Sequence, residues 1–421
     1  MRAQKIFLLF ITVVCFLMTL SGMDALAAEK IFKLGVLGPQ TGPAALTGTE
    51  MKLAAAMAFE KIGNKIGDYK IELIYIDDQS DAAKSTNAYS EAIERLGVQA
   101  GISNWNTAVS VAIQPILAKY KVPHFFVEGA GKAVNDTWFT YPPQERYLIM
   151  KGWPIPQKLV AGYADCINNA VEKNIWKPGK KVLALWGEDT DFGRSFAKGM
   201  KDLMIPKGWQ VFTEEYFILG QTEFYPFLNK CKQAGVTVLA GNSSSTASMS
   251  SLVKQFREVG IKAFLAADGL GYVGNWYELT GPASDGVLDM LPQITTPAQK
   301  VWAAEYKAKY GTDPSPSAAG MAYDYANFFI KVAKRTIEKY GKLDSQGLFE
   351  IGRAEVVTGK LVYDSKDGAL FHKRYRCNAQ SEPDPVISPD DFYFPVVQFK
   401  GGKTNVVWPG HLKTADLLVP K

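Results

Sequence analysis

The sequence predicts an α/β fold built from two doubly wound lobes with mostly parallel sheets. Strand-like and helix-like segments alternate along most of the chain, a rhythm typical of parallel strands joined by crossover helices. The alternation pauses once, over residues 139–156, a stretch that carries four prolines. Roughly 390 residues follow an N-terminal export signal, and that length is enough for two domains.

The export signal is expected over residues 1–27. Arg2 and Lys5 make its start positive, residues 6–20 form an apolar run, and residues 25–27 (Ala-Leu-Ala) provide a small-x-small cleavage site. The apolar run is too short to span a bilayer comfortably, and no later segment has the composition of a membrane span. We therefore expect the signal to be cleaved and the mature protein to reside in the periplasm.

The first lobe is expected to begin with the strand that directly follows the signal. The next helix places Leu53, Met57 and Ile62 at near-helical spacing, and Asp81 is a plausible N-cap for the helix after it. The expected elements are the strands 31–37, 70–76, 98–102 and 122–127 and the helices 46–62, 81–96 and 107–120.

The alternation of strand-like and helix-like segments resumes after residue 156 and predicts a second lobe. Its expected elements are the strands 181–186, 209–217, 237–240, 263–266 and 287–291 and the helices 192–205, 223–234 and 246–259. Two helices at 297–310 and 318–340 follow, and then three β-like segments at 356–363, 392–399 and 404–407.

Composition and residue counts narrow the function classes. The formal net charge is +5, signal included, and no Lys/Arg cluster stands out, so nucleic-acid binding has little support. The three histidines are scattered and no cysteine pair has metal-ligand spacing, so we expect no metal site, no cofactor and no histidine-based triad. One disulfide is possible among Cys166, Cys231 and Cys377, and the sequence does not indicate which two would pair.

Candidate binding residues come from the loops after the strands. Ligands of doubly wound sheets sit beyond the carboxyl ends of the strands, and two facing lobes bring these ends into one cleft. The loop after the 98–102 strand carries Asn104, Trp105, Asn106 and Thr107 before a helix N-terminus, a position that suits a carboxylate. The alternative is an ordinary helix cap by Asn106 or Thr107.

The next loop of the first lobe carries Glu128 followed by Gly129, Ala130 and Gly131. Three small residues let a ligand approach the backbone closely. Glu128 either pairs with a cation or is solvated. The glycine-rich turn at 38–43 lacks both GxGxxG spacing and a P-loop lysine, which disfavours nucleotide binding. This turn either lies on the rim of the cleft or is a plain tight turn.

The second lobe offers five further candidates. Phe192 either contacts an apolar group of the ligand or packs beneath the first turn of a helix. Ser245 lies in a loop that is rich in hydroxyl side chains. Asp268 is either a carboxylate placed for a ligand ammonium group or a turn residue. Just beyond it, Tyr272 and Trp276 either stack on a ligand or pack internally.

With these loops placed, the chain resembles a known family. The motifs that carry the resemblance are 34–42 (LGVLGPQTG), 75–78 (YIDD), 191–193 (DFG), 322–324 (AYD) and 363–368 (YDSKDG). Each is weak alone, but their order and spacing are similar to those of type I periplasmic solute-binding proteins. The similarity is to the branched-chain amino-acid (leucine/isoleucine/valine) group that serves ABC transporters, and it covers nearly the whole mature chain.

The resemblance implies three crossings between the lobes, near 147–156, 285–292 and 390–395. The first lobe would then comprise 28–148 and 288–391, and the second 149–287 and 392–421. Capture by lobe closure, docking of the closed form on an ABC permease, a monomeric state and no catalytic residue are also implied.

The resemblance also assigns site residues. It implies that Asn104–Thr107 and Gly129–Gly131 hold the ligand carboxylate and part of its amino group, that Phe192 replaces a cleft tyrosine, and that Asp268 pairs with the ligand ammonium. Segment 243–246 matches another cleft segment.

Two departures bear on the ligand. Trp105 stands where the family usually has serine and Gly131 where it usually has threonine, so two hydroxyls for a carboxylate are missing. The cleft also looks aromatic, with His124, Tyr272 and Trp276 among its candidates. The expected ligand is therefore an amino acid or a related small acid or amide, aromatic ones included.

Three rival functions stay open at this stage. A sensor that hands its signal to a membrane receptor would have the same fold and cleft. An exported hydrolase is disfavoured because Gly-x-Ser-x-Gly is absent. An interaction protein with a vestigial cleft would bind no ligand at all.

Overall fold

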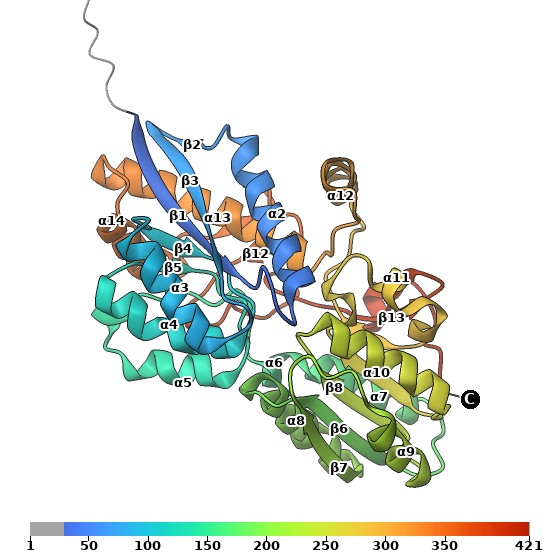
Figure 1. The fold of residues 1–421 in the computed structure, drawn as a ribbon. Helices are drawn as coiled ribbons and strands as arrows, with labels where there is room; N and C mark the ends of the chain where they lie inside the picture. The colour runs from blue at the N-terminus through green and yellow to red at the C-terminus, as the bar shows by residue number, and fades with distance from the viewer. Residues whose placement is uncertain (1–28, 421) are drawn as a thin grey trace, which may run out of the picture.

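The computed structural model describes residues 29–420 and folds them into two α/β lobes, each with its own sheet (Figure 1). This architecture confirms the predicted fold class. The predicted signal peptide lies outside the described residues. Between residues 29 and 420, no helix combines the length and the apolar character that crossing a membrane requires.

The first sheet has the strand order β2-β3-β1-β4-β5. Its strands are β1 (Lys30–Gly38), β2 (Lys65–Ile66), β3 (Tyr69–Asp77), β4 (Ala100–Ile102) and β5 (His124–Phe125). The central strand β1 pairs in parallel with both β3 and β4, and Phe32, Leu34 and Val36 on it are buried. A central parallel strand is covered by helices on both faces, which explains its nearly continuous apolar sequence.

Six helices cover this sheet. They are α2 (Ala45–Lys61), α3 (Ala82–Glu94), α4 (Thr107–Tyr120), α5 (Lys132–Thr140), α13 (Ala318–Tyr340) and α14 (Ser345–Ile351). Figure 1 shows α13, from late in the chain, beside α2, and the rings of Phe59 and Phe329 join the two helices at 6.4 Å between centroids. The long helix α13 therefore belongs to the first lobe, although the second lobe precedes it in sequence.

The second sheet has the strand order β14-β13-β10-β9-β8-β6-β7. Its strands are β6 (Val182–Glu188), β7 (Gln210–Phe217), β8 (Val238–Asn242), β9 (Phe264–Asp268), β10 (Leu288–Met290), β13 (Val396–Lys400) and β14 (Lys403–Trp408). The five strands from β6 to β10 are parallel, whereas β13 and β14 add an antiparallel edge.

Helices complete the second lobe and its surroundings. They are α6 (Pro156–Leu159), α7 (Ala161–Glu172), α8 (Asp191–Met204), α9 (Tyr225–Gln233), α10 (Thr246–Val259), α11 (Trp276–Thr280) and α12 (Pro297–Tyr310). The pattern in the sequence did not reveal α7, which directly follows the proline-bearing stretch.

The predicted strand at 356–363 is wrong. Helix α14 continues instead into a π-helical turn, Gly352–Val356, and only Tyr363–Asp364 (β11) is extended, paired with Arg374–Tyr375 (β12). Val356 and Val357 suggested a strand, but both are buried as part of the helical continuation. Tertiary burial thus overrides the β-propensity of adjacent valines.

The strand pairing bears on two of the predicted lobe boundaries, which we propose to revise. Leu148 and Lys151 form parallel bridges with His124 and Val127, so the chain leaves the first sheet after residue 151 rather than at 148. Strand β10 pairs with β9 and β13 in the second sheet, so residues 288–290 belong to the second lobe. We propose that the first lobe consists of 29–151 and 291–391.

Aromatic rings fill the space where the crossings meet. His372 stacks on Phe392 at 4.1 Å between ring centroids, and Trp153 lies 4.8 Å from Phe394. Burial lowers the pKa of His372 to about 3, so this imidazole is neutral. This hinge cluster, defined as Trp153, His372, Phe392 and Phe394, joins the first and third crossings through apolar contact.

Candidate functional site

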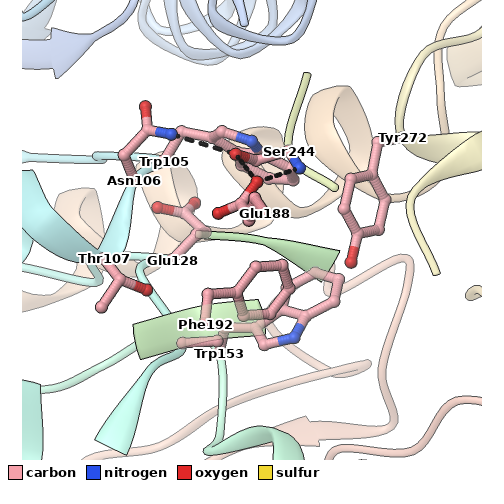
Figure 2. Close-up of a pocket in the computed structure, with 10 residues that line it drawn as sticks. Trp105, Asn106, Thr107, Glu128, Trp153, Glu188, Phe192, Ser244 and Tyr272 are labelled. Atoms are coloured by element: carbon pink, nitrogen blue, oxygen red, sulfur yellow. Dashed lines mark hydrogen bonds between the residues drawn. The ribbon is translucent and has the colours of Figure 1, made fainter. Parts of the chain in front are cut away.

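A small, partly enclosed cavity lies between the two lobes at the carboxyl ends of their strands (Figure 2). It holds about 20 Å³ of space for the centres of water-sized molecules, enough for one or two waters. The lining residues come from both lobes and from the first crossing: Trp105, Asn106, Thr107, Glu128, Ala130, Trp153, Glu188, Phe192, Ser244 and Tyr272. This position is the one expected for two doubly wound sheets that face each other.

Five of the ten residues predicted for the site line the cavity: Trp105, Asn106, Thr107, Ala130 and Phe192. The other five, Asn104, Gly129, Gly131, Ser245 and Asp268, are outside the lining set. Ser245 caps helix α10 by accepting a hydrogen bond from the backbone N–H of Ser248 at 3.3 Å. Asp268 is buried and accepts a hydrogen bond from the hydroxyl of Tyr272.

Two aromatic candidates and the opening turn lie elsewhere. His124 is buried beneath the first sheet's edge, where its ring contacts the hydroxyl of Tyr89 at 2.8 Å. Trp276 packs on Phe399 at 4.3 Å between ring centroids. Residues 40 and 41 of the opening turn are bound by Asp77 and do not line the cavity.

Glu128 is the lining residue with the least satisfied side chain. It is 4% exposed, and its Oε2 accepts only a weak hydrogen bond of 3.3 Å from the backbone N–H of Asn104. Its Oε1 is buried and has no partner. Burial raises the pKa of this carboxyl well above its usual range, because removal from water penalises the charged form.

Glu188, at the end of β6, takes part in the one hydrogen-bonded chain that Figure 2 shows across the cavity. Its Oε2 accepts hydrogen bonds from the backbone N–H and the hydroxyl of Ser244 at 2.7 and 2.8 Å. The Ser244 hydroxyl in turn accepts from Nδ2 of Asn106 at 3.2 Å. Since Asn106 belongs to the first lobe, this chain joins the two lobes. Burial raises the pKa of Glu188 as well.

A second pair of carboxylates lies behind Tyr272. Asp268 bonds the Tyr272 hydroxyl, and burial raises its pKa. Asp289 accepts backbone N–H groups of Gly271 at 2.8 Å and Met290 at 2.7 Å, so it holds the loop after β9 in place. Asp268 therefore acts on the cavity through the tyrosine.

Three rings form one wall of the cavity. Trp105 lies 5.0 Å from Tyr272 and 6.2 Å from Trp153 between ring centroids, and Trp153 lies 5.8 Å from Tyr272. All three pairs are edge-to-face. Phe192 faces them from the N-terminal turn of α8, beside Trp153 in Figure 2. The indole Nε1 of Trp105 is buried without a partner.

A carboxylate of the second lobe is bound at the start of helix α5. Asp191 Oδ2 accepts the backbone N–H of Ala133 at 2.8 Å, and the N–H of Gly131 donates to the Thr107 hydroxyl at 2.9 Å. A Cβ at Gly131 would lie 2.4 Å from Asp191 Oδ2, so only glycine allows this approach. Side chains of the protein thus bind the N–H groups of Gly131 and Ala133.

Comparison with known proteins assigns the family. The sequence model of the periplasmic binding protein family matches residues 32–373. The chain belongs to the periplasmic binding protein family. This is a family of non-catalytic solute-binding proteins.

Two curated relatives of this periplasmic binding protein illustrate the range of similarity. The leucine-, isoleucine-, valine-, threonine- and alanine-binding protein of Pseudomonas aeruginosa is 27% identical over 352 residues, 81% of this chain and 88% of the relative. The Leu/Ile/Val-binding protein homolog 6 of Brucella abortus is 29% identical over 171 residues, 37% of this chain and 44% of the relative.

Solved structures share the fold at low sequence identity. A leucine-binding protein of Thermotoga maritima has a TM-score of 0.67 at 20% identity, covering 89% of this chain and 97% of its own. An ABC-transporter solute-binding protein of Rhodopseudomonas palustris, crystallised with 3,4-dihydroxybenzoic acid, has a TM-score of 0.71 at 20% identity, covering 89% and 95%. These likenesses confirm the fold of this periplasmic binding protein.

Cysteines and potential metal ligands are the remaining reactive groups of the described residues. Cys166, Cys231 and Cys377 are buried and free of disulfides. Between residues 29 and 420, no three His, Cys, Asp or Glu side chains are grouped so as to hold a metal ion.

Proposed function

We propose that this protein is the extracytoplasmic solute-binding subunit of an ABC importer and captures an amino acid or a related small acid or amide. One observation carries the proposal: a small cavity is lined by residues of both lobes and of the crossing between them. A solute held there touches both lobes at once, so its binding energy favours the closed arrangement over an open one.

The ten predicted residues enter this proposal in two groups. We propose that Trp105, Asn106, Thr107, Ala130 and Phe192 contact the solute directly. The remaining five support them, since Asn104, Gly129 and Gly131 shape the first-lobe loops while Ser245 and Asp268 hold the loops of the second lobe.

The proposed partner of the closed form is a membrane permease of the ABC type. The export signal expected over residues 1–27 supports a periplasmic location, where such a receptor would meet its solute. Family membership supports a role in which solute is handed on unchanged.

The test begins with the purified protein. Mass spectrometry of small molecules released on denaturation identifies any solute that copurifies, and calorimetry with amino acids, amides and small acids measures saturable binding. Small-angle scattering then compares the radius of gyration with and without the solute. We expect one-to-one binding accompanied by compaction. Binding without compaction contradicts lobe closure, and the absence of any bound solute contradicts the proposed function.

A matched pair of variants locates the solute. Phe192→Ala removes a lining ring, whereas Phe399→Ala removes a buried ring outside the cavity that packs on Trp276. We expect the first change to weaken solute binding and the second to lower stability while leaving the affinity of the folded protein unchanged.

A further inference from the structure

We propose that the cavity recognises a compact cation with N–H donors, such as an alkylammonium, amidinium or guanidinium group, and that the ligand needs no carboxylate. The inference rests on the proposed function and names the chemical class of its solute. Four features of the site support it: its charge, its unpaired acceptors, the occupied position at helix α5, and its aromatic wall.

All ionisable side chains that line the cavity, tyrosine aside, are acidic. Glu128 and Glu188 line the cavity and Asp268 lies directly behind Tyr272, yet none of the ten lining residues is Lys, Arg or His. None of these three carboxylates forms an ion pair within residues 29–420. Buried carboxylates are costly unless they are paired, and a cationic ligand supplies the missing partner.

Unpaired acceptors point to N–H groups on that cation. Oε1 of Glu128 and Oδ1 of Asn106 are both buried without a hydrogen-bond partner, and both residues line the cavity. Their side chains are 4% and 6% exposed. A buried acceptor without a donor costs free energy that a ligand N–H recovers. Among the lining atoms that are fully buried without a partner, Nε1 of Trp105 is a donor, and the two acceptors outnumber it.

One of the two positions for a ligand carboxylate is already filled. Sequence resemblance assigned that carboxylate to the loops of Asn104–Thr107 and Gly129–Gly131, and the second loop leads into the N-terminus of α5. In the structure, the carboxylate of Asp191 binds the N–H of Ala133 there, and Thr107 accepts the N–H of Gly131. An anionic ligand at this second position would have to displace Asp191, and one at the first position would share the cavity with Glu128.

The aromatic wall fits the same chemistry. The negative faces of tryptophan, tyrosine and phenylalanine rings attract a cation within about 6 Å of their centroids. Trp105, Trp153, Tyr272 and Phe192 all line the cavity, and Figure 2 shows them surrounding the two glutamates. The small size of the cavity favours a ligand of few heavy atoms.

The first experiment varies charge at constant shape. Acetamidinium, acetamide and acetate have four heavy atoms each and differ in net charge and in N–H donors. Ligands this small have dissociation constants on the order of 10⁻⁴ M at best, so calorimetry and NMR titration at millimolar concentration are required. We expect binding in the order acetamidinium, acetamide, acetate, with at least tenfold between the first and the last. Equal or tighter binding of acetate overturns the proposal.

The second experiment asks whether a carboxylate contributes. Ethylamine and alanine differ only by the carboxylate, as do methylamine and glycine. We expect each amine to bind at least as tightly as its amino acid. An amino acid that binds tenfold or more tightly than its amine overturns the proposal, as does a failure of every cation to bind. In either case a different solute that binds in the cleft with lobe closure leaves the proposed function standing.

The third experiment uses an isosteric variant. Glu128→Gln keeps the shape but cannot ionise when a cation binds, and we expect roughly 10- to 100-fold weaker binding of acetamidinium with little change for acetamide. Asp324→Asn is the matched control, because Asp324 is a buried carboxylate of the first lobe that accepts the N–H groups of Leu370 and Phe371 outside the cavity. Equal losses for acetamidinium and acetamide refute the pairing with Glu128.

Discussion

The contact of Asp191 with helix α5 yields a quantitative prediction for the substitution Asp191→Asn. The side chain lies on the second lobe, and its Oδ2 accepts the N–H of Ala133, on the first lobe, at 2.8 Å. The amide oxygen of asparagine preserves an acceptor but removes the charge, which costs about 1 kcal/mol at a partly exposed site. Loss of the favourable interaction with the helix N-terminus adds about 0.3–1 kcal/mol.

Together these terms destabilise the closed arrangement by about 1–2 kcal/mol relative to the open one, because the place of Asp191 in the first turn of α8 is common to both arrangements and cancels. Since a solute that bridges the lobes must supply this difference, its affinity is expected to fall by roughly 5- to 30-fold. Calorimetry measures the affinity, and small-angle scattering measures the extent of closure.

Asp189→Asn is the matched control. Asp189 lies two residues earlier, is exposed, and pairs with Arg194 of its own lobe. We expect this variant to bind the solute as the unmodified protein does. Unchanged affinity in Asp191→Asn, or an equal loss in both variants, would refute the reasoning that Asp191 joins the lobes.

Three further predictions follow from other parts of the molecule. Burial raises the pKa of Glu50 from 4.5 to about 8, so between these pH values the folded state retains a proton that the unfolded state has lost. The free energy of unfolding should therefore fall as the pH rises from 4.5 to about 8, and in Glu50→Gln it should depend less steeply on pH, as measured by denaturant titration at each pH. Trp153→Leu should weaken a cationic solute by about 1–2 kcal/mol in calorimetry, whereas Trp276→Leu, outside the cavity, should not. Because the cysteines from Cys166 onward are free and buried, reductant should not change Tm, and thiol reagents should react only on unfolding.

The two lobes could be predicted because the burial of their strands and helices produces recognisable patterns of apolar residues in the sequence. Strand β1 is apolar on both faces because it lies in the middle of a sheet covered by helices, and this is visible without coordinates. Strand β10 has three residues, too few for periodicity to show which sheet it joins. Its pairing depends on long-range contacts with β9 and β13, which the local sequence does not encode.

The site residues could be predicted where they lie in loops that directly follow the ends of strands. That rule identified Trp105, Asn106, Thr107 and Phe192 among the residues that line the cavity. Trp153 was missed because it lies on a crossing, to which the rule does not apply. Glu188 was missed because a glutamate before a helix start is usually solvated, and only the structure shows that it is buried and bound by Ser244.

Asp268 shows a different limit of sequence reasoning. Its position at the end of β9 is the one expected of an ammonium partner, but the hydroxyl of Tyr272 occupies its Oδ1. The sequence indicated the correct loop without indicating which of its two polar side chains reaches the cavity. That choice depends on the turn after β9, which Asp289 holds through the backbone N–H groups of Gly269 and Gly271.

Trp153 belongs both to the cavity wall and to the hinge cluster, since its ring lies 5.8 Å from Tyr272 and 4.8 Å from Phe394. The protein therefore contains an intrinsic optical probe at the point where solute contact and lobe rotation meet. Emission of its indole should respond to the nearby charge and to the packing of the crossings at once. A Trp153→Phe variant, subtracted from the signal of all nine tryptophans, would isolate that response and allow stopped-flow measurement of closure without an attached dye.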